Sequence, residues 1–399
     1  MTKLGLVLSG GSIRGVAHIG MLKSLEEHGL LDDIQVAVGT SAGSIVASMF
    51  ALGYSPDEMW EIWKSDVWRM FGGKPSAGAV EDWNWSGLFD AIFHLDYKRF
   101  RGFLKGNKLL KALQCYLLED PKCTSIRPTR KRLPLYVIST DFTTGQETVW
   151  CFTRHIPPAT LEAARGDFEP APGRMAFWEV HRDYDPEVLQ FPNLAEVCRC
   201  SASIPFIFVP ARAPIAYKHR AAVDNLYTDG GVRDNYSLSA AVKLSECDRV
   251  VGMFLGSLDI TNQPWNGLFD MANRTLDQMG TTIFEADQDD GQIRTTDIRT
   301  LVPHFTGSVG TFDVGAMKML YDAGHLVTEN FLKAVQDAAG ELTWDAIFNT
   351  TQFTSLPAGA SLRGAQPRAR NLDAPGEEAQ PQPEVRYYIY REIAGSTQP

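Results

Sequence analysis

Apolar and polar positions in the first part of the chain follow a repeating order. Residues 4–8 form a short apolar run that ends in a serine and two glycines, which predicts a buried strand entering a tight turn. Apolar residues then recur at helical spacing from 16 up to Gly29, a residue type that commonly stops a helix. A second apolar run over 35–38 ends in another glycine-rich turn. Strand, glycine turn and helix, repeated, indicate an α/β fold with a parallel sheet and helices packed on it.

Later segments carry the same kinds of pattern. Strands are expected over 135–139, 148–152, 250–255 and 385–393, with the second of these as the hairpin partner of the first. Helices are expected over 45–52, 56–68, 108–118, 195–203, 237–245, 264–285 and 313–336.

Changes in composition divide the chain into one domain and a tail. Residues 1–345 are predicted to form the domain, with an aromatic lid or interfacial segment over 71–107 and an irregular insertion over 153–192 that is rich in proline, glycine and charges. Proline, alanine, glutamine and charged residues dominate the following stretch, so 346–399 is expected to be a loosely ordered tail with a terminal strand.

The segment 83–104 is rich in tryptophan and phenylalanine, beginning with Trp83 and Trp85. It has two interpretations: a helix packed on the sheet, or an interfacial segment whose aromatic face enters lipid with nearby lysines and arginines at the headgroups. A separate basic cluster, formed by Arg127, Arg130, Lys131 and Arg132, is expected to be a solvated loop rather than a phosphate site.

Composition and charge exclude several classes of protein. The chain has 399 residues, 44% hydrophobic and 22% charged, which is ordinary for a globular protein. Asp plus Glu exceed Lys plus Arg by 48 to 38, and this acidic balance disfavours nucleic acid as a partner. Six scattered cysteines without zinc-ligand spacing are expected to be reduced thiols. With no secretory signal pattern and no long apolar stretch, a cytoplasmic protein that can lie peripherally on a membrane is expected.

Two glycine-rich turns carry the candidate chemistry. Gly39-x-Ser41-x-Gly43 lies between an expected strand and an expected helix, the context in which such a turn exposes a nucleophilic serine. The segment from Gly10 to Gly15 follows the first strand in the same way, and its backbone N–H groups can hold an anion. That anion can be a nucleotide phosphate or the oxyanion of acyl transfer. The GxSxG turn follows one strand–turn–helix unit later, and a nucleophilic serine beside these N–H groups favours the oxyanion over the phosphate.

The base that activates the serine has two candidates at this stage. In a Ser-His-Asp esterase the histidine follows the acid in the chain, and His304 and His325 lie late enough to serve. Asp229-Gly230-Gly231 instead offers a carboxylate on a glycine turn that can approach Ser41 directly. A nucleotide-binding regulatory module that uses the Gly10–Gly15 turn remains the alternative from another class.

Together these motifs resemble the patatin-like phospholipase family. The family shows a glycine-rich turn near the N-terminus, a GxSxG turn soon after, and a distant DG[GA] motif, which correspond here to Gly10–Gly15, Gly39–Gly43 and Asp229–Gly231. The run Ser201-Ala202-Ser203-Ile204-Pro205 is similar to the family's SSAIP segment. The similarity covers about 3–152 and 194–257, with a faint echo at 297–333.

The resemblance implies a three-layer fold with a central, mostly parallel sheet flanked by helices, and a Ser–Asp dyad without histidine. Ser41 would be the nucleophile and Asp229 the base, with the oxyanion hole formed by the backbone around Gly10, Gly11 and Ser12. The supporting residues of these motifs would be Arg14, Gly15, Gly39, Gly43, Gly230 and Gly231.

The expected activity is hydrolysis of fatty-acyl esters of phospholipids or lysophospholipids through an acyl-enzyme, without a metal or organic cofactor. The expected partners are a membrane phospholipid or another acyl-lipid and, transiently, the membrane surface. Ser12 stands where the family has glycine, and a positive φ there would cost energy.

Overall fold

The computed structural model describes a large part of the chain. The described residues are 2–70, 84, 102–118, 126, 128, 130–152, 176–178, 188–190, 192–214, 216–217, 225–256, 279, 290–303, 305, 313–350 and 387–391. Several expectations fall outside them: Trp83, Trp85, Arg127, His304, nearly all of the helix expected over 264–285, and most of the insertion and the tail.

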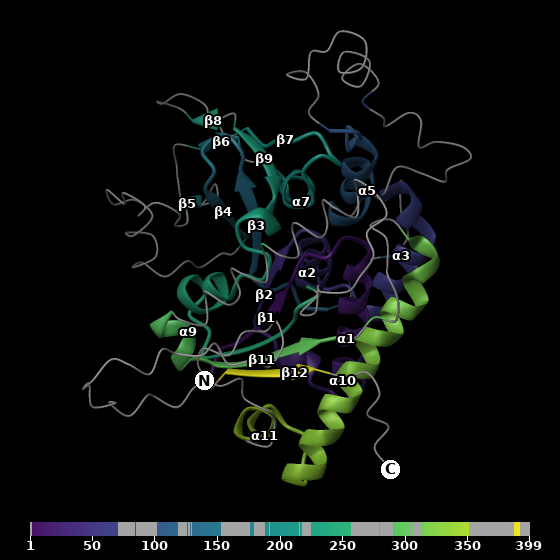
Figure 1. Cartoon of the computed structure of the whole chain (residues 1–399), viewed down its shortest axis with the longest axis vertical. Helices are drawn as coiled ribbons and strands as arrows, with labels where there is room; N and C mark the ends of the chain where they lie inside the picture. The colour runs from purple at the N-terminus through teal and green to yellow at the C-terminus, as the bar shows by residue number, and fades with distance from the viewer. Residues whose placement is uncertain are drawn as a thin grey trace, which may run out of the picture.

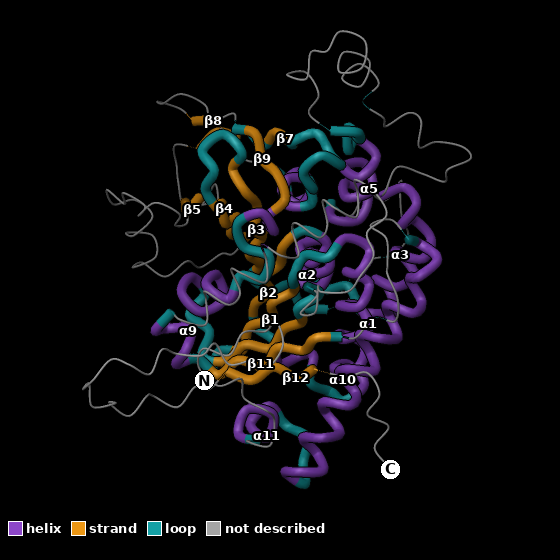
Figure 2. The backbone as a smooth tube through the Cα atoms, viewed as in Figure 1, coloured by secondary structure: helices purple, strands orange, loops and turns teal. Residues whose placement is uncertain are grey.

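The described strands form one large sheet and a separate pair. In the large sheet β12, β11, β10, β1, β2 and β3 lie side by side in that order and run parallel (Figures 1 and 2). β4 and β9 are antiparallel to β3, β5 is parallel to β4, and β7 is antiparallel to β9. β6 and β8 form the pair. The strands are β1 Leu4–Leu8, β2 Val36–Thr40, β3 Leu135–Asp141, β4 Glu147–Phe152, β5 Ala176–Trp178, β6 Val188–Gln190, β7 Ala211–Arg212, β8 Ala216–Tyr217, β9 Leu226–Asp229, β10 Arg249–Met253, β11 Asp297–Val302 and β12 Tyr387–Arg391.

Helices cover the sheet on both faces. Figure 1 shows α1, α3, α5 and α10 on one side and α9 on the other. No described helix is both long enough and apolar enough to cross a bilayer. The helices are α1 Val16–Glu27, α2 Ala42–Leu52, α3 Pro56–Met70, α5 Asn107–Leu117, α7 Leu194–Ser201, α9 Gly291–Thr295, α10 Met317–Ala339 and α11 Trp344–Asn349, with short turns η1 Ser12–Gly15, η2 Leu31–Asp33, η5 Gly230–Val232, η6 Ala240–Leu244 and η7 Val314–Ala316.

Successive side chains of the strands point to opposite faces of the sheet, and this alternation produces two hydrophobic cores. In β1, Leu4, Leu6 and Leu8 join a large buried cluster with the residues of α1, α2 and α10. Val7 points to the other face, into a second cluster that includes residues of η6 and α9. Successive side chains of a strand alternate between faces, so every strand between two helical layers must be apolar on both. The predicted α/β fold with a mostly parallel sheet flanked by helices is confirmed.

Two strands, β9 and β11, do not follow the hydrophobic patterns that predict the other strands. β11 is interrupted by charged residues, and Arg299 in it is nonetheless fully buried. Its guanidinium donates to the carbonyl oxygens of Ile347 and Phe348 at the end of α11, which provides the partners that a buried charge needs. β9 is only four residues long and ends in the Asp-Gly-Gly turn, so its sequence is more typical of a turn than of a strand. The alternation over 385–393 contains β12, which pairs with β11.

The expectation of six reduced cysteines is wrong for Cys115. Cys115, on α5, is disulfide-bonded. Cys151, Cys198, Cys200 and Cys247 are buried free thiols. Disulfide formation depends on which cysteines the fold brings together, and spacing along the chain does not determine that.

Candidate active site

Ser41 occupies the sharp turn between β2 and α2. Its backbone has φ 53 and ψ −123, a conformation that residues other than glycine rarely adopt. The residue is buried, and it directly precedes the N-terminus of α2, where the helix dipole favours negative charge. This is the geometry expected of a nucleophile elbow.

The two glycines of the Gly39-x-Ser41-x-Gly43 motif are required by close backbone contacts. A Cβ atom at Gly43 would lie 2.3 Å from the carbonyl oxygen of Leu8, and one at Gly39 would lie 2.5 Å from the carbonyl oxygen of Gly43. Neither space admits a side chain. The motif therefore lets α2 begin directly against β1 and β2, and this packing fixes the position of Ser41.

Asp229 lies at the end of β9, opposite Ser41. The Ser41 hydroxyl donates to Asp229 Oδ2 at 2.6 Å, without an intervening residue. The other carboxylate oxygen, Oδ1, accepts the backbone N–H of Gly231 at 2.8 Å. Gly230 lets this turn lie against β3, because a Cβ there would be 2.4 Å from the carbonyl oxygen of Ile138. A serine and a carboxylate 188 residues apart thus meet in one buried pair.

Burial changes the acidity of this carboxyl group. Removal from water raises the pKa of Asp229 from its ordinary value of 3.8 to about 7, while the hydrogen bonds from Ser41 and Gly231 lower it. A carboxyl with a pKa near neutrality can accept a proton from a substrate or a nucleophile and release it again. Asp234, in the following turn, is also buried and has its pKa raised to about 6 by the same loss of water.

The first glycine turn lies against the elbow. A Cβ at Gly10 would be 2.9 Å from Cβ of Ser41. The Gly10 N–H already donates to the carbonyl oxygen of Asn235 at 3.1 Å. The Gly11 N–H makes no hydrogen bond with the described part of the chain. Ser12 has φ 55, so the serine takes the left-handed conformation that glycine would take without strain.

Arg14 and Gly15 stabilise the first glycine turn. The backbone N–H and the Nε of Arg14 both donate to the carbonyl oxygen of Gly11, at 3.1 and 3.2 Å. Gly15 is packed against α2, since a Cβ there would lie 2.7 Å from Cβ of Ala42.

No described histidine bonds to Ser41 or Asp229. His18, on α1, is fully buried and its Nε2 lies 2.8 Å from the carbonyl oxygen of Ser9. Burial lowers the pKa of His18 to about 4, although the hydrogen bond with Ser9 raises it, so the ring is neutral near pH 7. His325 lies on α10 and its Nε2 contacts Glu27 at 2.8 Å.

One group of side chains in the described structure has the composition of a metal site. Ligand atoms of Glu27, His325 and Glu329 lie within 4.8 Å of one another. They already have partners: His325 pairs with Glu27, and Glu329 accepts from Ser24 at 2.6 Å and contacts His28 at 3.1 Å. These pairs join α1 to α10 and account for the cluster.

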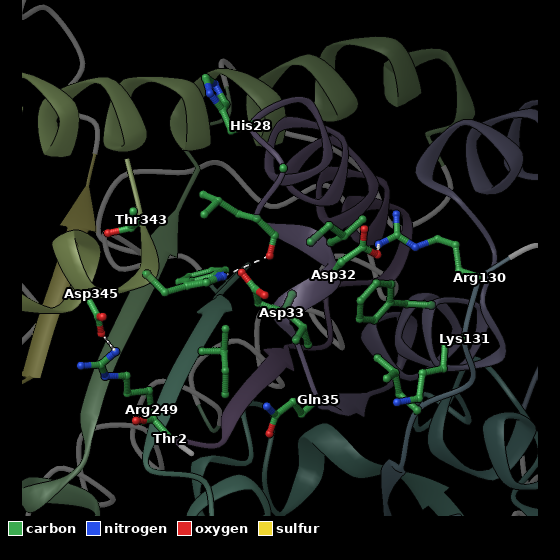
Figure 3. A pocket seen from close by; sticks show the side chains of 18 of the residues that line it. Thr2, His28, Asp32, Asp33, Gln35, Arg130, Lys131, Arg249, Thr343 and Asp345 are labelled. Carbon is green, nitrogen blue, oxygen red and sulfur yellow. Dashed lines mark hydrogen bonds and ion pairs between the residues drawn. The ribbon is translucent and has the colours of Figure 1, made fainter. Parts of the chain in front are cut away.

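A cavity of about 800 Å³ (Figure 3) lies at the amino ends of the parallel strands, whereas Ser41 follows the carboxyl end of β2. It is lined by residues that precede or begin the parallel strands, among them Leu4, Gln35 and Arg249. Arg130 and Lys131 of the basic cluster lie at its edge, and Arg130 forms ion pairs with Glu26, at 3.1 Å, and with Asp32. The positive charge of Arg130 is therefore neutralised by acidic residues of the protein itself.

Ser201 and Asn235 bond to the two glycine turns, although the sequence predicts no role for either residue. The hydroxyl of Ser201 accepts the backbone N–H of Ser41, and the Asn235 backbone accepts that of Gly10. Both belong to conspicuous runs, Ser-Ala-Ser-Ile-Pro and Asp-Gly-Gly-Val-Arg-Asp-Asn. These sequence runs mark Ser201 and Asn235 as candidates for a role near the site. Their hydrogen bonds to the backbones of Ser41 and Gly10 are seen only in the folded chain.

Similarity to known proteins indicates the family of this chain. The model of the patatin-like phospholipase family matches residues 6–242, a span that contains both glycine turns and Asp229. Lysophospholipase NTE1 of Candida albicans is 40% identical over 73 residues, which are 17% of this chain and 5% of that protein. Lysophospholipase NTE1 of Eremothecium gossypii is 49% identical over 51 residues, 13% of this chain and 3% of that protein. The matches thus span 5% or less of the length of these two relatives.

Solved structures show distant likeness. VipD from Legionella pneumophila matches with a TM-score of 0.39 at 14% identity, over 82% of this chain and 67% of that one. Human GIVD cytosolic phospholipase A2 matches with a TM-score of 0.32 at 12% identity, over 65% of this chain and 46% of that one. The match of the family model over more than half of the chain decides the assignment: this chain belongs to the patatin-like phospholipase family, a family of serine hydrolases that act on carboxylic esters.

Proposed function

We propose that this protein is a lipid acyl hydrolase that cleaves fatty-acyl ester bonds of phospholipids or lysophospholipids. The observation that carries the proposal is the direct 2.6 Å hydrogen bond from the Ser41 hydroxyl to Asp229 Oδ2 in a buried site. Membership of the patatin-like phospholipase family supports a lipid ester as substrate.

The proposed reaction has two halves. Asp229 accepts the hydroxyl proton as Ser41 Oγ attacks the ester carbonyl, and the tetrahedral intermediate collapses to an acyl-enzyme as Asp229 returns the proton to the leaving alcohol. Asp229 then takes a proton from a water molecule as that water attacks the acyl-enzyme. It returns the proton to Ser41 Oγ as the fatty acid leaves. All these steps use groups of this chain and water.

The negative charge that develops on the carbonyl oxygen needs donors close to Ser41. The Gly10–Ser12 turn lies beside Ser41, and backbone N–H groups fixed in place are effective oxyanion donors. Because the Gly10 N–H is already bonded to Asn235, the N–H of the next residue, Gly11, is the proposed donor. The N-terminus of α2 adds a favourable dipole.

A lipid substrate requires contact with a membrane or micelle surface, and two exposed aromatic residues lie on segments that also carry residues near the site. Phe142 directly follows β3, whose Ser139 pairs with Asp229, and its side chain is 61% exposed. Phe206 follows Ser201 by five positions, is 60% exposed, and has φ 67, an unusual value for a bulky residue. Together with the aromatic segment 83–104, which lies largely outside the described residues, they support transient membrane surface contact.

Release of fatty acid tests the proposed function. Purified protein is incubated with lysophosphatidylcholine micelles, phosphatidylcholine vesicles and a soluble p-nitrophenyl ester, and free fatty acid or p-nitrophenol is measured. We expect hydrolysis of the ester and of at least one lipid. No turnover of any of these substrates, together with specific binding of a nucleotide by the Gly10–Gly15 turn, would favour the regulatory module instead.

The raised pKa of Asp229 predicts the pH dependence of the rate. Asp229 acts as a base only when ionised, so kcat/KM on the soluble ester should rise with pH through about 7 and then level off. Below that pH the rate should fall about tenfold per pH unit. A stopped assay over about pH 5 to about pH 9 checks this. A profile that is flat across that range in a stably folded enzyme would show that no base of this pKa is involved.

A further inference from the structure

The segment that ends α7 contacts the backbones of both residues of the proposed dyad. The hydroxyl of Ser201 accepts the backbone N–H of Ser41 at 2.8 Å and donates its own proton to the carbonyl oxygen of Ile138 in β3. The direction of both bonds is fixed, because an N–H can only donate and a carbonyl can only accept. One side chain therefore joins the elbow to the strand that pairs with β9.

This connection is fully enclosed. Ser201 and Ile138 have no exposed surface and Ser41 is 4% exposed, so water does not reach the three groups to replace a lost bond. A buried backbone N–H or carbonyl that loses its partner destabilises its surroundings. Without the Ser201 hydroxyl, both the Ser41 N–H and the Ile138 carbonyl would be left unpaired at this point.

The unusual backbone conformation of Ser41 depends on the contacts that hold it, including the hydrogen bond of its N–H. A serine with φ 53 persists only where the surrounding contacts hold it, because L residues prefer negative φ. The Ser201 hydroxyl acts on the amide of that residue itself. Loss of this contact removes one restraint on the turn that aims Ser41 Oγ at Asp229.

The same segment also holds Asp229. Two residues after Ser201, the carbonyl oxygen of Ser203 accepts the backbone N–H of Asp229 at 2.9 Å and the Thr228 hydroxyl at 2.8 Å. The buried guanidinium of Arg199 donates to the Ser203 hydroxyl and to the carbonyl oxygens of Gly106 and Val209. Residues 201–203 are thus anchored on one side and contact the backbones of both Ser41 and Asp229 on the other.

We propose that Ser201 is a positioning residue for the reaction: its hydroxyl holds the strained elbow so that Ser41 Oγ stays in hydrogen-bonding contact with Asp229. This inference rests on the proposed function. Ser201 acts through the Ser41 backbone and does not touch the ester. Its removal should therefore slow the chemical step more than it weakens substrate binding.

Substitution of Ser201 by alanine tests this role. We expect kcat on a soluble p-nitrophenyl ester to fall by about 10- to 100-fold, as for loss of a buried hydrogen-bond partner, while KM changes by less than about threefold. The acid limb of the pH profile should also move to higher pH, because the hydrogen bond from Ser41 lowers the pKa of Asp229. Ser201→Cys keeps a weakly bonding group of similar size and should have an intermediate kcat.

Ser48→Ala is the matched control. Ser48 is also a fully buried serine at the α2–α7 contact, 3.1 Å from Cys198 Sγ, and has no hydrogen bond to Ser41 or Asp229. It should alter thermal stability without changing kcat or the pH profile. Wild-type kcat and an unshifted acid limb in folded Ser201→Ala or Ser201→Cys would overturn the inference. If the wild type itself neither hydrolyses the ester nor reacts with a fluorophosphonate, the proposed function is at fault, and not only the role of Ser201.

Discussion

Replacement of Ser41 by alanine should abolish ester hydrolysis, with a loss of at least about 10⁴-fold in kcat. The reason is chemical: the hydroxyl oxygen is the atom that forms the acyl-enzyme, and the Asp229 carboxylate it contacts would have no nucleophile to activate. The loss is measured as p-nitrophenol release by purified wild-type and variant proteins. More than a few percent of wild-type turnover in the variant would show that another group is the nucleophile.

The control for this prediction is again Ser48→Ala, on the helix that directly follows Ser41. It removes a buried hydroxyl of the same kind, so it reports any general cost of such a change in α2. We expect near wild-type turnover in Ser48→Ala, and cooperative thermal unfolding in both variants. An equal loss of activity in both would point to damage to the helix and not to loss of the nucleophile.

Replacement of Asp229 by asparagine should cost on the order of 10³-fold or more in kcat. Asparagine keeps the size and the acceptor for Gly231, but an amide cannot take the proton of Ser41. Residues that act as one catalytic unit lose nearly the whole effect when either is removed. The variant is compared with the wild type at a pH above 7, where Asp229 is ionised.

Asp141→Asn provides a matched control for Asp229→Asn. Asp141 is also buried at the end of a strand, and its Oδ1 accepts the backbone N–H groups of Thr143 and Thr144 in a turn. It has no hydrogen bond to Ser41. We expect Asp141→Asn to retain most of the wild-type kcat. A loss as large as that of Asp229→Asn would mean that any change of a buried carboxyl in this region disables the protein.

The parts of the fold that follow hydrophobic periodicity could be predicted from the sequence. β1 and α1 lie where the apolar pattern indicates, because a strand between two helical layers must be apolar on both faces. β11 could not be predicted in this way. Its Arg299 is compensated by carbonyl groups about 50 residues later, and a local pattern carries no information about such a partner.

The same distinction applies to the site. Ser41 and Asp229 stand in short motifs with a chemical meaning, and the glycines around them indicate tight turns. The distance between the two residues, the bond that occupies the Gly10 N–H, and the contact from Ser201 to the Ser41 backbone depend on β3, β9 and α7 coming together. Those contacts join positions far apart in the chain, so they follow from tertiary packing and not from spacing.

The central claim is that Asp229, and no histidine, activates Ser41. It is tested most directly by measuring kcat on a soluble ester for Asp229→Asn, His325→Ala and His304→Ala side by side, with folding verified for each. The account predicts a loss on the order of 10³-fold or more for Asp229→Asn. Both histidine variants should stay within about threefold of the wild type, since His325 pairs with Glu27 on the helix surface. A fully active Asp229→Asn enzyme, or a folded but inactive histidine variant, would contradict the dyad.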